Sequence, residues 1–200
     1  MKPTSLKITL LAAILCASST WTGHTESLAI GNCTWCHGAS AQGYAPAPRL
    51  AGQSPEYIEK QLINFGDHTR DNPFSRQYMW GAAANLSQQM THYLAVYFST
   101  VPPKAADDGF RDLVSIGATI YQDGIPDSNI VSCVACHGPN AEGVGDIPRL
   151  GGLSYYYLKR RLEQWGEGFN SAAKFPMPRI ASGLSPDQID ALASYLSFVQ

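Results

Sequence analysis

The pentapeptide Cys-x-x-Cys-His occurs twice in this chain of 200 residues, at 33–37 and again, one hundred positions later, at 133–137. The motif is part of a longer repeat, because residues 33–66 align with residues 133–166 at the same shift. The residues identical between the two copies are Cys33, Cys36, His37, Gly38, Ala41, Gly43, Pro48, Arg49, Leu50, Gly52, Ser54, Tyr57, Leu62 and Gly66. A duplication of this length predicts two small, similar units rather than one large core.

The motif has a direct chemical explanation. Two thiols at this spacing reach the two vinyl groups on one edge of a porphyrin, and the adjacent histidine is then held below the iron. The sequence therefore predicts two covalently bound haem c groups, attached through Cys33, Cys36, His37, Cys133, Cys136 and His137. A large apolar cofactor would also complete the core of units that are small for stabilisation by burial alone.

Paired cysteines have two other interpretations. A redox-active Cys-x-x-Cys needs a thioredoxin-like βαβ context, and it gives no reason for a histidine directly after both pairs. A Cys₄ zinc site usually draws on pairs that lie much closer in the sequence than these. Haem attachment accounts for all six repeated residues.

The repeat also predicts the domain boundaries. After residue 166 the register slips by two positions, so that Leu86 pairs with Leu184. The segment around Pro102 and Pro103 disfavours a continuous helix and suits an extended linker. The predicted organisation is a signal peptide over 1–22, a first domain over 23–100, a linker over 101–106 and a second domain over 107–200.

The amino-terminal segment indicates export. Lys2 and Lys7 precede the apolar run 8–17 and then small residues, a pattern typical of a cleaved secretory signal and too short for an ordinary membrane span. A periplasmic location is therefore expected. The full chain has 14 basic and 16 acidic residues, and cleavage of the signal would remove Lys2 and Lys7 from the basic ones. The exported chain is therefore expected to be acidic, and nucleic acid is not an expected partner.

Local patterns predict an all-α fold. Ser54, Ser87, Ser154 and Ser185 each precede a helical apolar stripe, and Ser185 is followed by Gln188 in a capping-box arrangement. The expected inward residues of the helices after Ser87 and Ser185 are Leu94, Tyr97 and Phe98, and Ile189, Leu192, Ala193 and Leu196. The second unit has residues 110–122 for an amino-terminal helix, whereas that helix is expected to be shortened or absent in the first unit.

These motifs, together with Pro48-Arg49-Leu50 and Pro148-Arg149-Leu150, resemble the dihaem cytochrome c4 family over nearly the whole mature chain. The resemblance implies two tandem class I cytochrome c domains related by a pseudo-twofold axis. It also implies that the Pro48 and Pro148 carbonyls accept hydrogen bonds from the haem-binding histidines. Arg49 and Arg149 become candidates to pair with haem propionates, with a solvated or interdomain arginine as the alternative.

The second iron ligand is predicted from the repeat. Met79 lies seven residues before Leu86, and Met177 lies seven before Leu184. A single methionine is ordinarily core filler, but two at one place in a repeat favour sulfur ligation. Proline on both sides of Met177 is expected to stiffen a loop that presents its sulfur, whereas Met79 lacks such neighbours. Met90 is interpreted as a helix residue and His92 as a surface residue; His68 is also expected at the surface and is the first substitute ligand for Met79.

Histidine–methionine ligation suits electron transfer. The leading hypothesis is a periplasmic carrier of single electrons, not an enzyme, between a quinol-oxidising complex or dehydrogenase and a terminal oxidase or reductase, with membrane association only through a partner. The alternatives are a dihaem electron-accepting subunit of a dehydrogenase or oxidase, and a small peroxidase or thiosulfate-oxidising enzyme with an open iron. The helix that is expected to be shortened or absent in the first unit motivates a further hypothesis, that the first haem is the docking or more labile site.

Overall fold

The computed structural model describes residues 25–44, 46–169 and 176–200, and within them the chain forms helices joined by loops. A helical stretch over 25–37 comes first. The elements that follow it are α2 (Pro55–Gly66), η1 (Ser75–Met79), α3 (Trp80–Ala83), α4 (Gln88–Thr100), η2 (Arg111–Leu113), α5 (Val114–Asp123), η3 (Pro126–Ser128), α6 (Val134–His137), α7 (Tyr155–Gly166), α8 (Met177–Ser182) and α9 (Pro186–Phe198). Over these residues β-structure is limited to two isolated bridges, so the all-α prediction is confirmed.

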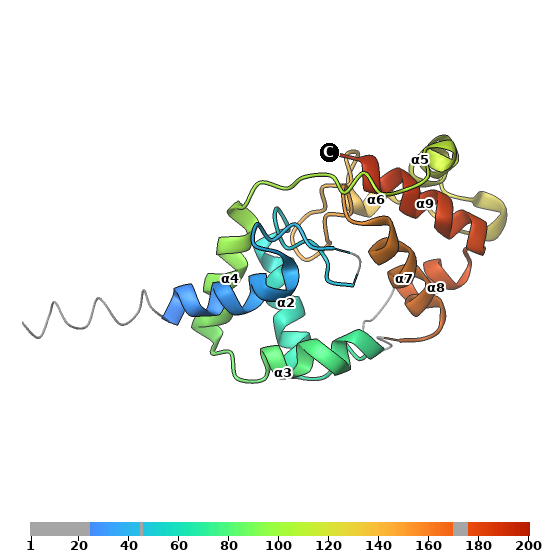
Figure 1. The fold of residues 1–200 in the computed structure, drawn as a ribbon. Coiled ribbons are helices and arrows are strands. Elements are labelled where there is room, and N and C mark those ends of the chain that lie inside the picture. The colour runs from blue at the N-terminus through green and yellow to red at the C-terminus, as the bar shows by residue number, and fades with distance from the viewer. Residues whose placement is uncertain (1–24, 45, 170–175) are drawn as a thin grey trace, which may run out of the picture.

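The repeat is visible in the arrangement of the helices. In each half the last helix packs on the helix that follows the motif loop, α4 on α2 and α9 on α7 (Figure 1). Ser54 caps α2 by accepting from the Tyr57 N–H at 3.1 Å, and Ser185 forms the predicted capping box with Gln188. The predicted helix starts are therefore confirmed.

The start of α7 differs from that of α2 in how it is capped. Ser154 makes no side-chain cap; instead Asp108, just after the linker, accepts from the Tyr155 N–H at 2.7 Å and from the Ser154 hydroxyl at 2.7 Å. A carboxylate here also complements the helix dipole. A residue distant in sequence thus replaces the local cap.

Each half has its own hydrophobic core. The first is built on Ile58, Leu94 and Phe98, and the second on residues that include all four inward positions predicted for α9. Tyr97 was predicted to point inward and is 37% exposed, so that assignment is wrong. Its ring lies edge-on to Phe98, at the margin of the core.

The amino-terminal helix of the first half was expected to be shortened or absent, and the structure shows that a helix is present there. Residues 25–37 are helical and run directly into the first motif, and Ala29 and Ile30 pack against the core formed with α4. In the second half α5 and α6 are separate helices joined by a loop. An absent helix therefore no longer supports the hypothesis that the first haem is the docking or more labile site, which stays a prediction.

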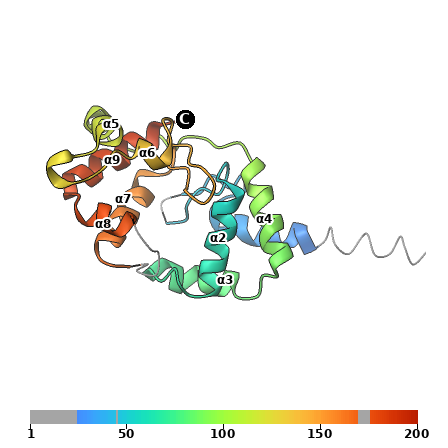
Figure 2. The same cartoon turned by 180° about the vertical axis from the view of Figure 1, so that it is seen from behind.

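The loops that follow the two motifs lie between the helices of the two halves in both views (Figures 1 and 2). They are joined there by Gln53, whose side chain donates to the Arg149 carbonyl at 2.7 Å and accepts from the Arg149 N–H at 3.0 Å. The chain leaves α4 at Thr100 and has no helix over 102–108. Gln42 holds this connection by accepting from the Lys104 N–H and donating to the Pro102 carbonyl.

None of the helices in the described ranges is long and apolar enough to cross a bilayer. The predicted signal peptide over 1–22 lies outside the described residues, as does part of the segment before Met177.

Candidate haem-binding sites

The two motif histidines occupy matching environments. His37 is 6% exposed and His137 is 7% exposed, and Nδ1 of each lies close to a proline carbonyl oxygen, 2.7 Å from Pro48 and 2.9 Å from Pro148. Burial lowers the pKa of both imidazoles despite the carbonyl contact. A neutral ring with its proton held on Nδ1 leaves the Nε2 lone pair free, which is the state that binds a metal.

A glycine turn brings each proline carbonyl to its histidine. Gly43 and Gly143 adopt φ of 74° and 73°, and the N–H of each donates to the motif histidine carbonyl at 2.8 Å. A Cβ on Gly43 would lie 2.4 Å from the Arg49 nitrogen, so only glycine lets the Pro-Arg-Leu segment approach. Glycine is repeated at both positions, but the repeat alone does not predict this role.

The motif cysteines have the character of attachment points. Cys33 and Cys133 are half-buried, Cys36 and Cys136 are exposed, and none of the four is in a disulfide. Burial raises the pKa of the Cys33 thiol, and that of Cys133 to about 11. A redox-active pair needs a lowered thiol pKa, so this environment disfavours that alternative. Nor do the described residues bring three His, Cys, Asp or Glu side chains together as a zinc site requires.

The two predicted sulfur ligands lie in different local structures. Met79 ends a π-helical turn inside a helical stretch that continues into α3, and Asn72 braces this turn by accepting from the Ser75 N–H at 3.2 Å. Met177 begins α8 between Pro176 and Pro178, so it stands at a helix start and not within a loop as predicted. Both methionines are half-buried. A π-turn inside an α-helix is frequent at functional sites.

The competing side chains lie where the sequence predicted. Met90 is in α4 and packs against the first core. His92 is exposed and pairs with Glu59 at 3.3 Å. His68 is also exposed, and its ring stacks on Trp80 with centroids 4.0 Å apart.

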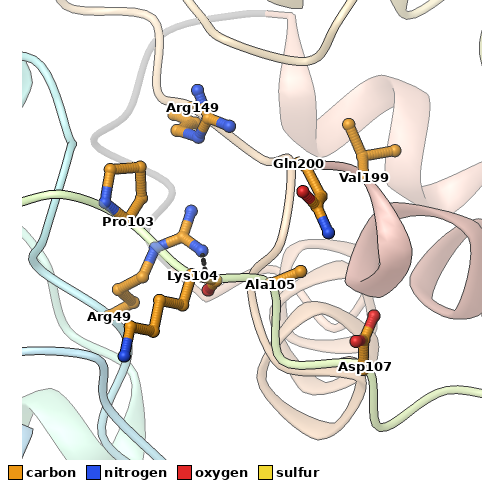
Figure 3. Close-up of a pocket in the computed structure, with 8 residues that line it drawn as sticks. All are labelled: Arg49, Pro103, Lys104, Ala105, Asp107, Arg149, Val199 and Gln200. Atoms are coloured by element: carbon orange, nitrogen blue, oxygen red, sulfur yellow. Dashed lines mark hydrogen bonds between the residues drawn. The ribbon is translucent and has the colours of Figure 1, made fainter.

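Arg49 serves the interface between the halves. It is 4% exposed, and its two terminal nitrogens donate to the carbonyls of Lys104, Gly152 and Gly151 at 2.6, 2.8 and 2.6 Å. Burial lowers its pKa to about 10, which leaves it a cation at neutral pH. Arg49 and Arg149 line a cavity of about 310 Å³ beside the linker (Figure 3). Arg49 is therefore an interdomain arginine, which was the predicted alternative to pairing with a haem propionate.

The comparisons with known proteins agree with this geometry. The cytochrome c family model matches residues 114–200. The chain is 36% identical to cytochrome c4 of Thiocapsa roseopersicina over 179 residues, which is 86% of this chain and 88% of that protein. The chain belongs to the cytochrome c4 family. The solved structure of the Acidithiobacillus ferrooxidans cytochrome c4 matches with a TM-score of 0.78 at 32% identity, covering 84% of this chain and 98% of the other.

A further relative has a more specific name. The thiosulfate dehydrogenase electron acceptor of Stutzerimonas stutzeri (strain A1501) is 38% identical over 173 residues, or 84% of this chain and 78% of the relative. As a member of the cytochrome c4 family, this protein is an electron-transfer cytochrome with two haem c groups, and its partners are redox proteins.

The residues present fit two haems of the cytochrome c4 type. Each motif offers a free imidazole Nε2 beside two thiols that form no other bond. In addition, the Nε atoms of Arg49, Arg70 and Arg160 are buried without a hydrogen-bond partner. Buried polar atoms are rarely left unpaired, so these donors indicate an acceptor that the protein atoms do not supply. Haem bears carboxylates that meet this need.

Proposed function

We propose that this protein works in the periplasm as a carrier that takes up and releases single electrons at two six-coordinate haem irons. His37 and Met79 bind one iron, and His137 and Met177 bind the other. The observation that carries the proposal is the duplicated contact of each buried histidine Nδ1 with a proline carbonyl, at 2.7 and 2.9 Å.

The protein's contribution is to hold each ligand in one state. The Pro48 and Pro148 carbonyls fix the proton on Nδ1, which orients the imidazole and keeps Nε2 unprotonated. Burial disfavours the imidazolium form and so works in the same direction. The Met79 and Met177 thioethers would favour the reduced iron, and an iron held by both a histidine and a methionine would leave no place for a substrate. The bound haem supplies the reversible one-electron change.

Ligand variants test this assignment. In Met79→Leu and Met177→Leu, the methionine-to-iron charge-transfer band should fall by half in each single variant and vanish in the double variant. Met90→Leu is the matched control, because Met90 is a half-buried methionine of α4 that packs against the first core. A band that survives in the double variant would reject both ligands. A high-spin spectrum of the unmodified protein would favour the enzymatic alternative.

The donor and acceptor are redox proteins of the respiratory chain, with a quinol-oxidising complex or dehydrogenase on one side and a terminal oxidase or reductase on the other. Any membrane association is through such a partner. Stopped-flow mixing with a reduced donor should give reduction of both haems in two one-electron steps. Catalytic loss of peroxide or thiosulfate by the protein alone would contradict a pure carrier.

A dehydrogenase that oxidises thiosulfate is a second candidate donor, favoured by the 38% identity with a thiosulfate dehydrogenase electron acceptor. A purified thiosulfate dehydrogenase supplied with thiosulfate should then reduce this protein much faster than it reduces a class I monohaem cytochrome of similar potential. Equal rates would remove this candidate, while leaving the carrier function in place.

A further inference from the structure

Three arginines converge where the two halves meet, and we name Arg70, Arg160 and Arg161 the arginine cluster. Arg70 follows α2 in the first half, whereas Arg160 and Arg161 lie on α7 in the second. Arg70 donates across the interface to the Tyr157 hydroxyl at 3.2 Å, and Arg160 donates across it to the Pro46 carbonyl at 2.9 Å. The cluster is therefore built from both halves.

The partners that the described residues give the cluster are uncharged. Arg70 also donates to Gln61 at 2.8 Å, and Arg161 donates to Gln164 at 3.1 Å. Aromatic rings cover the guanidinium groups: Phe65 at 4.7 Å from Arg70, Phe74 at 4.1 Å from Arg160 and Trp165 at 5.0 Å from Arg161. None of the ion pairs formed by the described residues includes a member of the cluster.

No side chain outside the described ranges supplies the missing negative charge. Residues 1–24, 45 and 170–175 contain no aspartate or glutamate, so every carboxylate side chain of the protein is among the described residues. Burial lowers the pKa of Arg161 to about 10, with the charge of Arg70 acting in the same direction. All three side chains thus remain cations at neutral pH, and partly buried cations without an anion are costly.

Two of these arginines keep a donor unused. The Nε atoms of Arg70 and Arg160 are buried and have no hydrogen-bond partner. Arg70 itself is only 9% exposed. An Nε–H and a terminal N–H on one side of a guanidinium form the fork that fits a carboxylate, so the unused atoms belong to the edge of the group that binds such a ligand.

The cluster lies beside the first haem site. The Arg70 carbonyl accepts from the Trp80 indole at 2.9 Å, and Trp80 is the neighbour of Met79. The Pro46 carbonyl bound by Arg160 is two residues before Pro48, which holds His37. The cluster therefore contacts both the segment that holds His37 and the segment that carries Met79, the proposed sulfur ligand.

We propose that the arginine cluster binds the carboxylates of the first haem, so that two arginines of the second half set the potential of the haem in the first half. This inference rests on the proposed function. The sequence-based candidate Arg49 is not part of the cluster, and its two terminal nitrogens donate to three backbone carbonyls near the linker. The cluster positions the cofactor and its charge, and it takes no part in iron ligation.

The test is a potentiometric titration of the haem-loaded protein, with spectra recorded at each step, in Arg160→Gln and Arg70→Gln. Loss of a cation beside the haem leaves both iron ligands in place. It disfavours the reduced state, because the negative charge of the propionates is then less effectively screened. The midpoint potential of the haem bound by His37 should therefore fall in both variants. Arg111→Gln is the control, because Arg111 is exposed and lies over Phe198 in the second half.

The pH dependence of that potential gives a readout that packing alone does not move. Tyr57, Tyr157 and the three arginines are the titratable groups of this cluster. Paired carboxylates stay ionised, so the wild-type potential should be flat between pH 6 and 8, roughly the range in which a released propionate gains a proton. The Arg160→Gln potential should fall as the pH rises through this range. Arg160→Lys keeps the charge without the fork, so its potential should change less with pH than that of Arg160→Gln.

The outcomes are separable. An Arg160→Gln protein with altered urea stability but an unchanged, pH-independent potential would overturn the inference and leave the cluster as interface packing. A change of equal size in Arg111→Gln would also overturn it. Absence of low-spin haem from the wild-type protein would overturn the proposed function, and this inference with it.

Discussion

The two halves of the molecule share the surroundings of the iron-binding histidine and differ in nearly everything that supports them. The contact between histidine and proline carbonyl and the glycine turn behind it are the same within 0.2 Å at His37 and His137. The amino-terminal helix, the cap of the following helix and the setting of the methionine are not the same. The repeat has therefore kept the cofactor geometry while the scaffold around it diverged.

The clearest difference lies in how the first helix of each half is packed. Gly117 brings α5 into backbone contact with α9, and a Cβ there would lie 2.0 Å from the Ala191 carbonyl oxygen. Tyr121, one turn later, is fully buried and donates to the Gly138 carbonyl at 2.6 Å, next to the second motif. In the first half Gly31 lies in the helix 25–37 with nothing within 4 Å of its Cβ position.

Substitution of these glycines should give the largest contrast. Gly117→Ala should lower the free energy of unfolding by about 3 kcal/mol, because the clash is with backbone that has no room to move. Gly31→Ala should instead raise it by up to about 1 kcal/mol, because alanine favours the helix. Denaturant unfolding of the haem-loaded protein measures both. Similar effects at the two positions would refute the difference in packing.

The interface arginines give the next contrast. Arg49→Ala should lower the free energy of unfolding by about 3 kcal/mol, because two buried hydrogen bonds and one part-buried hydrogen bond to carbonyls lose their charged donor. Arg149→Ala removes one side-chain bond, to the Gly151 carbonyl at 3.2 Å, and should cost about 1 kcal/mol. Urea unfolding followed separately at each haem would also show the halves uncoupling in Arg49→Ala. Equal losses would mean that the repeat is symmetric here after all.

The helix pairs carry side-chain contacts of opposite polarity at equivalent places, Glu59 with His92 in the first half and the ion pair of Lys159 with Asp190 in the second. Asp190 also accepts from the Tyr155 hydroxyl at 2.8 Å. Asp190→Asn should therefore cost about 1 kcal/mol, and Glu59→Gln less than about 0.5 kcal/mol, in thermal unfolding at neutral pH.

The pair of Lys159 and Asp190 predicts that stability depends on pH. Burial acts to raise the pKa of Asp190, but hydrogen bonds from Lys159 and Tyr155 hold this pKa below its ordinary value. A carboxylate with a lowered pKa in the folded state stabilises the protein above about pH 4 and loses this contribution as the pH falls further. The cost of Asp190→Asn should accordingly shrink below that pH. A constant cost between pH 3 and pH 7 would contradict the pairing.

The smallest effect is expected within the motifs themselves. Trp35 occupies the place of Ala135 and is 88% exposed. Trp35→Ala should change the free energy of unfolding by less than about 0.5 kcal/mol, because little of the side chain is buried. Its haem spectrum should match that of the unmodified protein. A loss of 2 kcal/mol or more would mean that the indole packs against the haem.

The sequence was sufficient for features that depend on neighbours in the chain. The motifs, the cap at Ser54, the capping box at Ser185 and the buried stripe of α9 are all local patterns, and the structure has them. The carbonyl contacts of Pro48 and Pro148 came from the family resemblance and are also present.

Features that depend on how the halves meet were not predictable in this way. Arg49 binds carbonyls more than one hundred residues away, and Asp108 caps a helix that begins 47 residues later. The arginine cluster is not predictable from the repeat because its members differ between the two copies: Arg70 aligns with Asn170, and Arg161 with Gln61. No periodicity marks a contact between two units whose relative placement is unknown.

Carbon monoxide binding to the fully reduced protein tests the central claim most directly, because the ligand binds only where the sixth position of a ferrous haem is open. If Met79 and Met177 both close their sites, an optical titration should show negligible binding at either haem in the resting protein. Ready binding at both haems would contradict the account of two closed electron-transfer centres.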